Sequence, residues 1–189
     1  LGLKPGNTDG TFIQKVPLVG ITGTEAKPLV VSGKGNGTFK WRDDVVAWTK
    51  HVADGAGIEN SELVFVGYGV SAPEYDWDDF KGVDLKGKTL VMLVNDPQVP
   101  DAADPSKLDA RTFNGAAMTY YGRWTYKFEE AARRGAAGAL IVHETGPAGY
   151  PFAVVQGNLS EKFDLVTPDK NMGRASIEGW LSLEAAKRL

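Results

Sequence analysis

Cysteine is absent from this chain of 189 residues. Its absence excludes disulfide bonds, thiolate catalysis and cysteine-ligated zinc, although it does not fix the compartment. Histidine is almost as scarce, since His51 and His143 are the only two. Neither lies in a His-x-Asp or His-Glu-x-x-His pattern, and two imidazoles leave few ways to form a zinc site or a serine triad. We therefore expect neither histidine to bind a functional metal.

The chain also lacks a strong net charge and a long apolar run. Its formal charge is −3, and no stripe of basic residues is interleaved with aromatics, so we expect no nucleic-acid partner. No apolar run approaches the roughly 18 residues of a membrane-spanning helix, so we expect no membrane span. The 23 glycines and 10 prolines favour many turns between short strands.

Several patterns that can carry chemistry are better explained as loops. The run from Gly67 to Ala72 matches the dinucleotide fingerprint, but Pro73 follows where a helix would have to start. The glycines at 33–37 lack the Gly-Lys-Ser/Thr ending of a phosphate loop. No Gly-x-Ser-x-Gly elbow occurs, and three aspartates between 101 and 109 do not match the spacing of a calcium loop.

The stretch from 120 to 143 is the most informative part of the chain. Trp124, Phe128, Ala131 and Ala132 are spaced to lie on one face of a helix, and Gly135 can provide the left-handed cap that ends it. Four charged residues fill much of the opposite face, which we expect to be solvated: Glu129, Glu130, Arg133 and Arg134.

Two aliphatic runs flank that helix, at Lys88–Val94 and Gly138–Val142. Neither alternates with polar residues, so each suits a strand that is covered on both faces. Two such strands joined through a helix predict a parallel, right-handed crossover unit.

The remainder of the chain predicts short elements around this unit. For Asp43–His51 the sequence does not distinguish a short helix from an irregular segment. Asp96–Met118 predicts a long loop. The other expected strands are 11–20 at a sheet edge, 29–32 and 38–41 as a hairpin, 63–70, 152–156 and 175–181, followed by a helix at 183–189.

Several of these segments, in this order, resemble the protease-associated (PA) domain. The hallmark is a helix that leads into a Gly-Ala-x-Gly turn and an aliphatic strand, here Ala131–Val142. The strand at Leu63–Val70, the Trp77–Phe80 loop and the Leu-Lys-Gly-Lys turn at 85–88 resemble the same domain. The resemblance covers roughly residues 10–189 and is closest to the PA domain inserted in secreted di-zinc aminopeptidases, relatives of glutamate carboxypeptidase II and the transferrin receptor.

The resemblance implies a β-rich α+β fold of the swivelling β/β/α kind, with a barrel-like strand core and few flanking helices. Residues 11–182 would form the PA domain, with 1–10 as the tail of a preceding peptidase segment or linker and 183–189 as the start of the following one. The parent would be a secreted or periplasmic aminopeptidase with two zinc ions in its peptidase domain. This chain would bind no cofactor itself and would not be catalytic. Its partners would be that peptidase domain and the peptide substrate.

Three residues at the start of the helix are candidates for substrate contact: Arg123, Trp124 and Tyr126. Aromatic and arginine side chains dominate binding hot spots, and PA domains of the glutamate carboxypeptidase relatives contribute arginines to the substrate cavity. In the other interpretation, the aromatics pack in the core and Arg123 is only solvated. Glu129–Glu130 lies within the PA-like motif, so we do not assign it to a catalytic centre. The main functional alternative is a free-standing module that binds an extended peptide.

Overall fold

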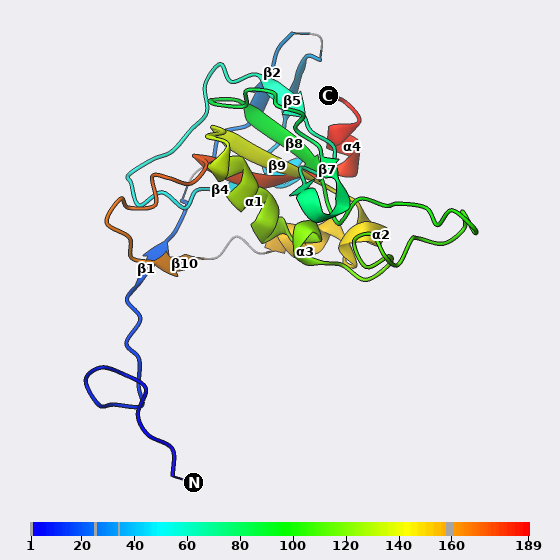
Figure 1. Ribbon diagram of the computed structural model, residues 1–189. Coiled ribbons are helices and arrows are strands. Elements are labelled where there is room, and N and C mark those ends of the chain that lie inside the picture. The colour runs from blue at the N-terminus through cyan, green and yellow to red at the C-terminus, as the bar shows by residue number, and fades with distance from the viewer. Residues whose placement is uncertain (1, 25, 34, 158–160) are drawn as a thin grey trace.

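The computed structural model describes residues 2–24, 26–33, 35–157 and 161–189. Its centre is a mixed five-stranded sheet with few helices around it (Figure 1). In spatial order, the strands are β4 (Val45–Trp48), β11 (Ile177–Ser182), β9 (Gly138–His143), β8 (Thr89–Leu93) and β5 (Leu63–Phe65). The last four are mutually parallel, and β4 pairs antiparallel with β11.

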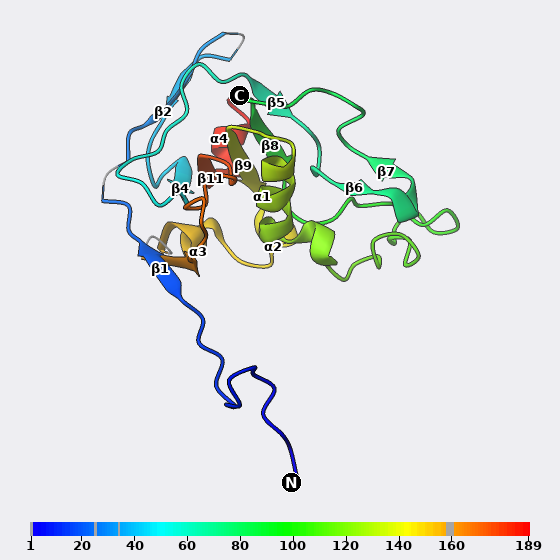
Figure 2. The same ribbon diagram turned by 60° about the vertical axis from the view of Figure 1, so that its left-hand side comes forward.

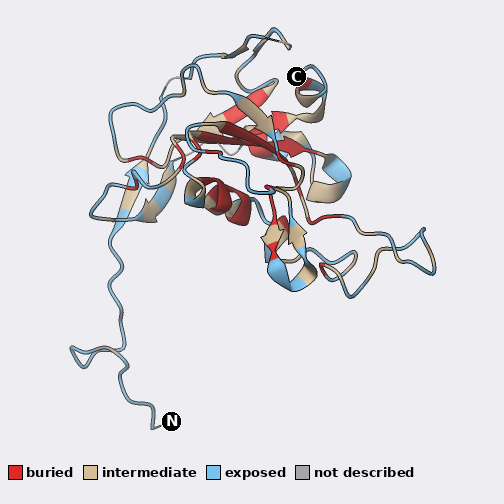
Figure 3. Cartoon of the chain, turned by 45° about the horizontal axis from the view of Figure 1, so that its top comes forward, coloured by how far each residue is buried: buried red, intermediate tan, exposed pale blue. Residues whose placement is uncertain are grey.

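The middle strand β9 has a core on each of its faces, because all six of its residues are buried. Ile141 belongs to one core, together with Phe128 and Ala131 of helix α1 (Trp124–Arg133). Leu140 and Val142 belong to the other, where helix α4 (Leu183–Ala186) packs. The two helices thus cover opposite faces of the sheet. Figure 3 shows the buried residues concentrated in this sheet and in α1. The two covered, parallel strands predicted on either side of the helix are confirmed.

Helix α1 ends as its sequence predicts. Gly135 has a φ of 67°, and its N–H donates to the carbonyl of Ala132 while the N–H of Ala136 donates to Ala131. These two bonds satisfy carbonyls that the helix leaves without partners. The cap turns the chain directly into β9, so it fixes how α1 lies on the sheet.

Shorter elements surround this centre. The hairpin expected at 29–41 forms from β2 (Leu29–Val31) and β3 (Gly37–Phe39). A second hairpin, β6 (Ser71–Ala72) with β7 (Trp77–Asp78), belongs to a third, aromatic cluster that includes Phe113 and Tyr126. The remaining elements are the 3₁₀ turns η1 (Pro73–Tyr75) and η2 (Tyr120–Gly122), helices α2 (Thr145–Ala148) and α3 (Phe152–Gly157), and strands β1 (Leu18–Ile21) and β10 (Lys162–Leu165).

Residues 2–17 extend away from the rest of the molecule and are almost entirely exposed (Figure 2). The chain joins the fold at β1, which pairs antiparallel with β10 as a separate two-stranded ribbon. The strand predicted at 11–20 is therefore correct only at its end.

The coarse α+β class, with short strands and few helices, is confirmed. The edge strands β4 and β5 do not pair with each other within the described ranges, so the expected barrel-like core takes the form of an open sheet. The strand predicted at 175–181 exists as β11, and the strand predicted at 63–70 exists as the shorter β5. The segment 43–51, for which the sequence did not distinguish a helix from an irregular segment, contains the strand β4.

The strand predicted at 152–156 is wrong, because these residues form α3. Pro151 precedes the helix, and its carbonyl accepts the N–H of Val154. Val155 packs against the core beside α1. Tertiary packing of one helical face thus overrides the strand preference of two adjacent valines.

Candidate functional site

A cleft of about 200 Å³ lies between α1, the β4–β11 side of the sheet, α3 and β10. Most of its lining is aromatic or aliphatic. The aromatic residues of the lining are Trp48, Trp124, Tyr150, Phe163 and Trp180, and its charged residues are Lys50 and Lys162. These residues come from distant parts of the sequence, and the sheet brings them together.

Phe128 of α1 anchors the aromatic wall. Its ring meets Trp48 edge to face with centroids 5.7 Å apart, and it meets Trp124 in the same way at 6.0 Å. Trp180 is buried beneath, as part of the same core. Trp124 is different, since 41% of it is exposed. The cleft therefore has a rigid aromatic floor and one accessible tryptophan at its mouth.

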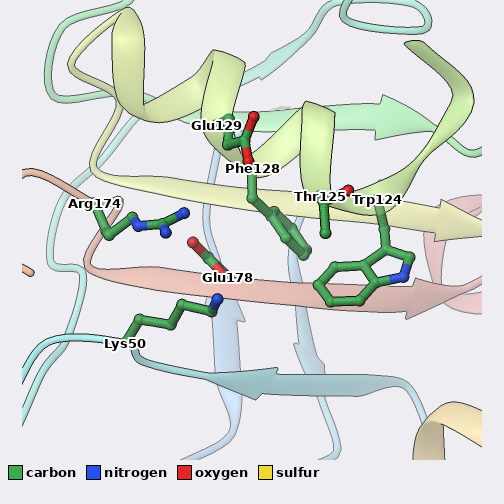
Figure 4. Close-up of a pocket in the computed structure, with 7 residues that line it drawn as sticks. All are labelled: Lys50, Trp124, Thr125, Phe128, Glu129, Arg174 and Glu178. Carbon is green, nitrogen blue, oxygen red and sulfur yellow. The ribbon is translucent and has the colours of Figure 1, made fainter. Parts of the chain in front are cut away.

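A smaller hollow of about 60 Å³ adjoins the cleft and shares Lys50 and Trp124 with it. Figure 4 shows the carboxylate of Glu178 between the side chains of Lys50 and Arg174. Glu178 is fully buried on β11. Its Oε2 accepts a hydrogen bond of 3.2 Å from Trp48 Nε1, whereas its Oε1 has no hydrogen-bond partner among the described residues. Burial raises the pKa of Glu178, although Lys50 and Arg174 oppose the shift.

Asp164 of β10 lies close to both Lys50 and Arg174, beside the smaller hollow. Its Oδ2 lies 3.2 Å from Lys50 Nζ and 3.8 Å from Arg174 Nη2. Burial alone would raise the pKa of Asp164, but the Leu165 N–H and Lys50 outweigh it and lower the pKa. Lys162 Nζ lies 5.3 Å from the centroid of the Trp48 ring. The charged side chains are thus held by defined partners next to the aromatic wall.

The structure separates the three residues proposed for substrate contact. Trp124 lines the cleft. Arg123 is exposed at the N-cap of α1, and its side chain makes no capping hydrogen bond. Tyr126 is only 5% exposed; its hydroxyl accepts from the N–H of Ser71 and donates to the Ser71 carbonyl. Residues i and i+2 of a helix do not share a face, so Tyr126 packs away from the cleft that Trp124 enters.

Glu130 contradicts the expectation of a solvated helix face. It is only 7% exposed, and its carboxylate is 2.7 Å from Arg133 Nη2 and 2.8 Å from Arg134 Nε. Arg134 in turn lies over the ring of Phe80, 3.5 Å from its centroid. The arginines therefore cover Glu130 while they pair with it. Its neighbour Glu129 lines the small hollow.

The two histidines lie in separate structural environments. His51 Nε2 is 3.0 Å from the carbonyl oxygen of Arg174. His143, at the end of β9, is buried among the rings of Tyr150, Phe152 and Trp180, and burial lowers its pKa. Among the residues that the structure describes, no three histidines or carboxylates gather into a group that could hold a metal ion.

Sequence reasoning missed most of the cleft. Glu178 did carry a signal, because it is a lone acid inside the aliphatic segment 175–181, and a buried charge in a strand often marks a site. Lys50, Lys162 and Arg174 lie in three other segments, and no local pattern links them. Only the pairing of β4 with β11 and the placement of β10 bring them together.

This arrangement is suited to binding. Aromatic walls provide apolar contact area, and the adjacent lysines, arginine and carboxylates provide charged hydrogen-bonding groups.

Comparison with protein-family models, with curated proteins and with solved structures finds no match to this chain. No helix in the described part of the chain is both long and apolar enough to cross a membrane.

Proposed function

We propose that this chain is the PA domain of a secreted or periplasmic zinc-dependent aminopeptidase, and that it caps the active site and shapes access of peptide substrates. The swivelling PA fold, the domain boundaries at 11 and 182 and the two zinc ions of the parent's peptidase domain are parts of this proposal. In this role the chain contributes binding surface and no catalytic group. A lid of this kind excludes water and sorts substrates by shape.

The observation that carries the proposal is the position of Trp124. It belongs to the segment that resembles the PA domain, and it is the most exposed tryptophan of the cleft lining. Accessible tryptophan beside ordered charged groups is typical of binding hot spots. Support also comes from the β8–α1–β9 unit, whose helix, glycine cap and buried strand follow the order of the PA motif.

The coding sequence on either side of this chain provides the first test. We expect it to encode a His-x-Asp motif and an adjacent glutamate pair, which supply zinc ligands and a general base in such peptidases. The 189-residue chain with added zinc should cleave an aminoacyl reporter no faster than buffer. Tight zinc binding together with cleavage by this chain alone would refute the proposal.

The second test uses the full-length enzyme. Trp124→Ala should raise KM for a peptide substrate and leave turnover of a small aminoacyl reporter unchanged, because the reporter is too short to reach the lid. Tyr120→Ala is the matched control, since Tyr120 is an exposed aromatic at the same end of α1 that does not line the cleft. Equal effects of the two substitutions would argue against a lid role for Trp124.

One observation favours a free-standing peptide-binding module instead. Strand β5 lies at the edge of the sheet, and Phe65 on it is 63% exposed. An extended peptide can add to such an edge through backbone hydrogen bonds. Flanking sequence without peptidase motifs, together with protection of the β5 amides on peptide binding, would favour this alternative.

A further inference from the structure

The buried carboxylate of Glu178 has one oxygen that the fold uses and one that it does not. Oε2 accepts the hydrogen bond of 3.2 Å from Trp48 Nε1. Oε1 has no hydrogen-bond partner within the part of the chain that the structure describes, although the residue is fully buried. A buried acceptor without a donor is costly, and most such groups in proteins are satisfied. Because Glu178 lines the smaller hollow, a donor that enters this hollow would satisfy Oε1.

The charges around Glu178 favour a neutral donor. Lys50 and Arg174 line the same hollow (Figure 4), and each directs its cation to Asp164, at 3.2 and 3.8 Å. When Glu178 is ionised, these four side chains carry two positive and two negative charges. A ligand ammonium group would add a cation beside Lys50, and a ligand carboxylate would add an anion beside Glu178. A neutral N–H group makes the hydrogen bond and leaves the charges balanced.

Glu129 also lines the hollow, and it has partners of its own on α1. Its Oε2 accepts a hydrogen bond of 2.8 Å from the Tyr120 hydroxyl and lies 3.8 Å from Arg133 Nη1. Glu178 is therefore the acid of the hollow that a ligand donor would satisfy.

Trp124 separates the hollow from the larger cleft. It lines both cavities, as does Lys50. Lys50 is held by its ion pair with Asp164, whereas Trp124 is partly exposed and meets Phe128 edge to face. Exposed side chains change rotamer on the order of nanoseconds or faster. Movement of Trp124 therefore joins the two cavities, and a ligand in the cleft can then reach Glu178.

The larger cleft describes the body of the ligand. Aromatic side chains and valines form most of its lining, and aromatic rings pack well against such a surface. An apolar cavity of about 150 Å³ holds benzene, so a volume of about 200 Å³ suits a system of two fused rings. Indole combines such a ring system with one N–H donor and no acceptor. The indole of Trp48 already donates to the other oxygen of the same carboxylate.

We propose that the cleft binds a tryptophan side chain of a peptide, with its rings against the aromatic lining and its indole N–H donating to Glu178 Oε1. The inference names the substrate class of the cleft assigned above to the lid, and it rests on the proposed function only for the source of the peptide. A lid with this site would retain tryptophan-containing peptides beside the active site.

Titration calorimetry on the 189-residue chain tests the proposal with N-acetyl-tryptophanamide and its analogue N-acetyl-3-benzothienylalaninamide, in which sulfur replaces the indole N–H. The two ligands have nearly the same shape and apolar surface, and only the first donates a hydrogen bond from its rings. We expect the tryptophan compound to bind on the order of tenfold more tightly, as for one hydrogen bond to a charged acceptor. N-acetyl-phenylalaninamide, which lacks the second ring and the donor, should bind more weakly than either.

Glu178→Gln is the main variant. Trp48 Nε1 still needs an acceptor, so the new amide turns its oxygen to Trp48 and its NH₂ group into the hollow. Two donors then face each other, and the preference for the tryptophan compound over its sulfur analogue should be lost. Glu184→Gln removes an exposed acid outside both cavities and should leave the preference unchanged.

Equal affinity for the two compounds in the unmodified chain, a preference that survives in Glu178→Gln, or no saturable binding at millimolar concentration would each overturn the proposal. The first and the third outcome need no variant, so the test does not depend on the folding of Glu178→Gln. These outcomes leave the lid role intact. Conversely, missing peptidase motifs in the flanking sequence would remove the lid role and leave the measured specificity of the cleft unchanged.

Discussion

The Nζ of Lys127 lies 2.6 Å from the carbonyl oxygen of Tyr68, inside the protein. Lys127 is fully buried in the middle of α1, and it donates a second, longer hydrogen bond of 3.3 Å to the carbonyl of Tyr121. Burial lowers the pKa of Lys127 to about 7, although Asp96 and Asp79 oppose the shift. This lysine therefore joins α1 to the loop before β6 and to η2 at an electrostatic cost.

That cost makes stability depend on pH. Below pH 7 both the folded and the unfolded chain hold the Lys127 proton, and the cost is fully present. Between pH 7 and the ordinary lysine value of 10.5, only the unfolded chain keeps the proton, so stability rises with pH. The contribution of Lys127 to the slope is at most about 1.4 kcal/mol per pH unit.

Lys127→Met should remove this contribution. We expect the free energy of unfolding of the unmodified chain, minus that of the variant, to increase steadily from pH 7 to pH 10 in urea titrations. Loss of the donor to Tyr68 and Tyr121 adds an offset that does not vary with pH. Lys15→Met, at an exposed position, is the control. A difference that stays constant across this range would show that Lys127 remains protonated in the fold.

Glu178 provides a second prediction, of opposite sign. Its pKa is raised in the folded chain, so the folded state holds the proton to higher pH than the unfolded state does. Its contribution to stability therefore falls as pH rises from the ordinary value of 4.5 through the raised value. Glu178→Gln removes the buried charge and keeps an acceptor for Trp48 Nε1. It should stabilise the chain at pH 7, because burial disfavours the charged carboxylate.

The gain from Glu178→Gln should disappear near pH 4, where the native carboxyl is already neutral. Thermal unfolding at the two pH values measures it. Glu184→Gln is the matched control, because Glu184 is exposed on α4 and its ion pair with Lys187 lies at the surface. A variant less stable than the unmodified chain at pH 7 would mean that Lys50 and Arg174 stabilise the carboxylate more than burial destabilises it.

Gly135 tests the helix cap. Its φ of 67° disfavours any residue with a side chain, and a Cβ there would come no closer than 3.5 Å to Lys86. The cost of Gly135→Ala is therefore purely a backbone cost, which we expect to be about 1 kcal/mol. Gly55→Ala, in open space without a positive φ, should change stability much less. Equal denaturation midpoints for the two variants would contradict the capping role.

The sequence predicted those features that local patterns encode. Gly135 marks the end of α1 because it follows the last apolar position of the helix. The two uninterrupted aliphatic runs become β8 and β9 because only a strand covered on both faces can bury every residue. Strand β4 was harder to predict, since its four residues follow Asp43 and Asp44 without alternation. Its partner β11 lies about 130 residues further along the chain.

The cleft could not be predicted for the same reason. Trp48, Lys162 and Glu178 become neighbours only when β4, β10 and β11 take their places. The helix pattern also placed Trp124 on the same face as Phe128, yet 41% of Trp124 is exposed. Glu130 was expected at the surface. It is buried because Arg133 and Arg134, at the end of the same helix, pair with its carboxylate and cover it.

Gly179 tests the pairing that builds the cleft. It lies on β11 opposite Ala47 of β4. A Cβ at Gly179 would lie 2.5 Å from the carbonyl oxygen of Val46 and 2.9 Å from the Cβ of Ala47, so β4 would have to move away. We expect Gly179→Ala to cost about 2 kcal/mol or more, as for overpacking a buried site.

Gly57→Ala, which meets no atom within 4 Å, is the control and should not change stability. Urea titration of the two variants measures the difference. Equal unfolding midpoints for Gly179→Ala and the unmodified chain would contradict tight pairing of β11 with β4 at this position, because a Cβ could then be accommodated beside Val46 and Ala47 without cost.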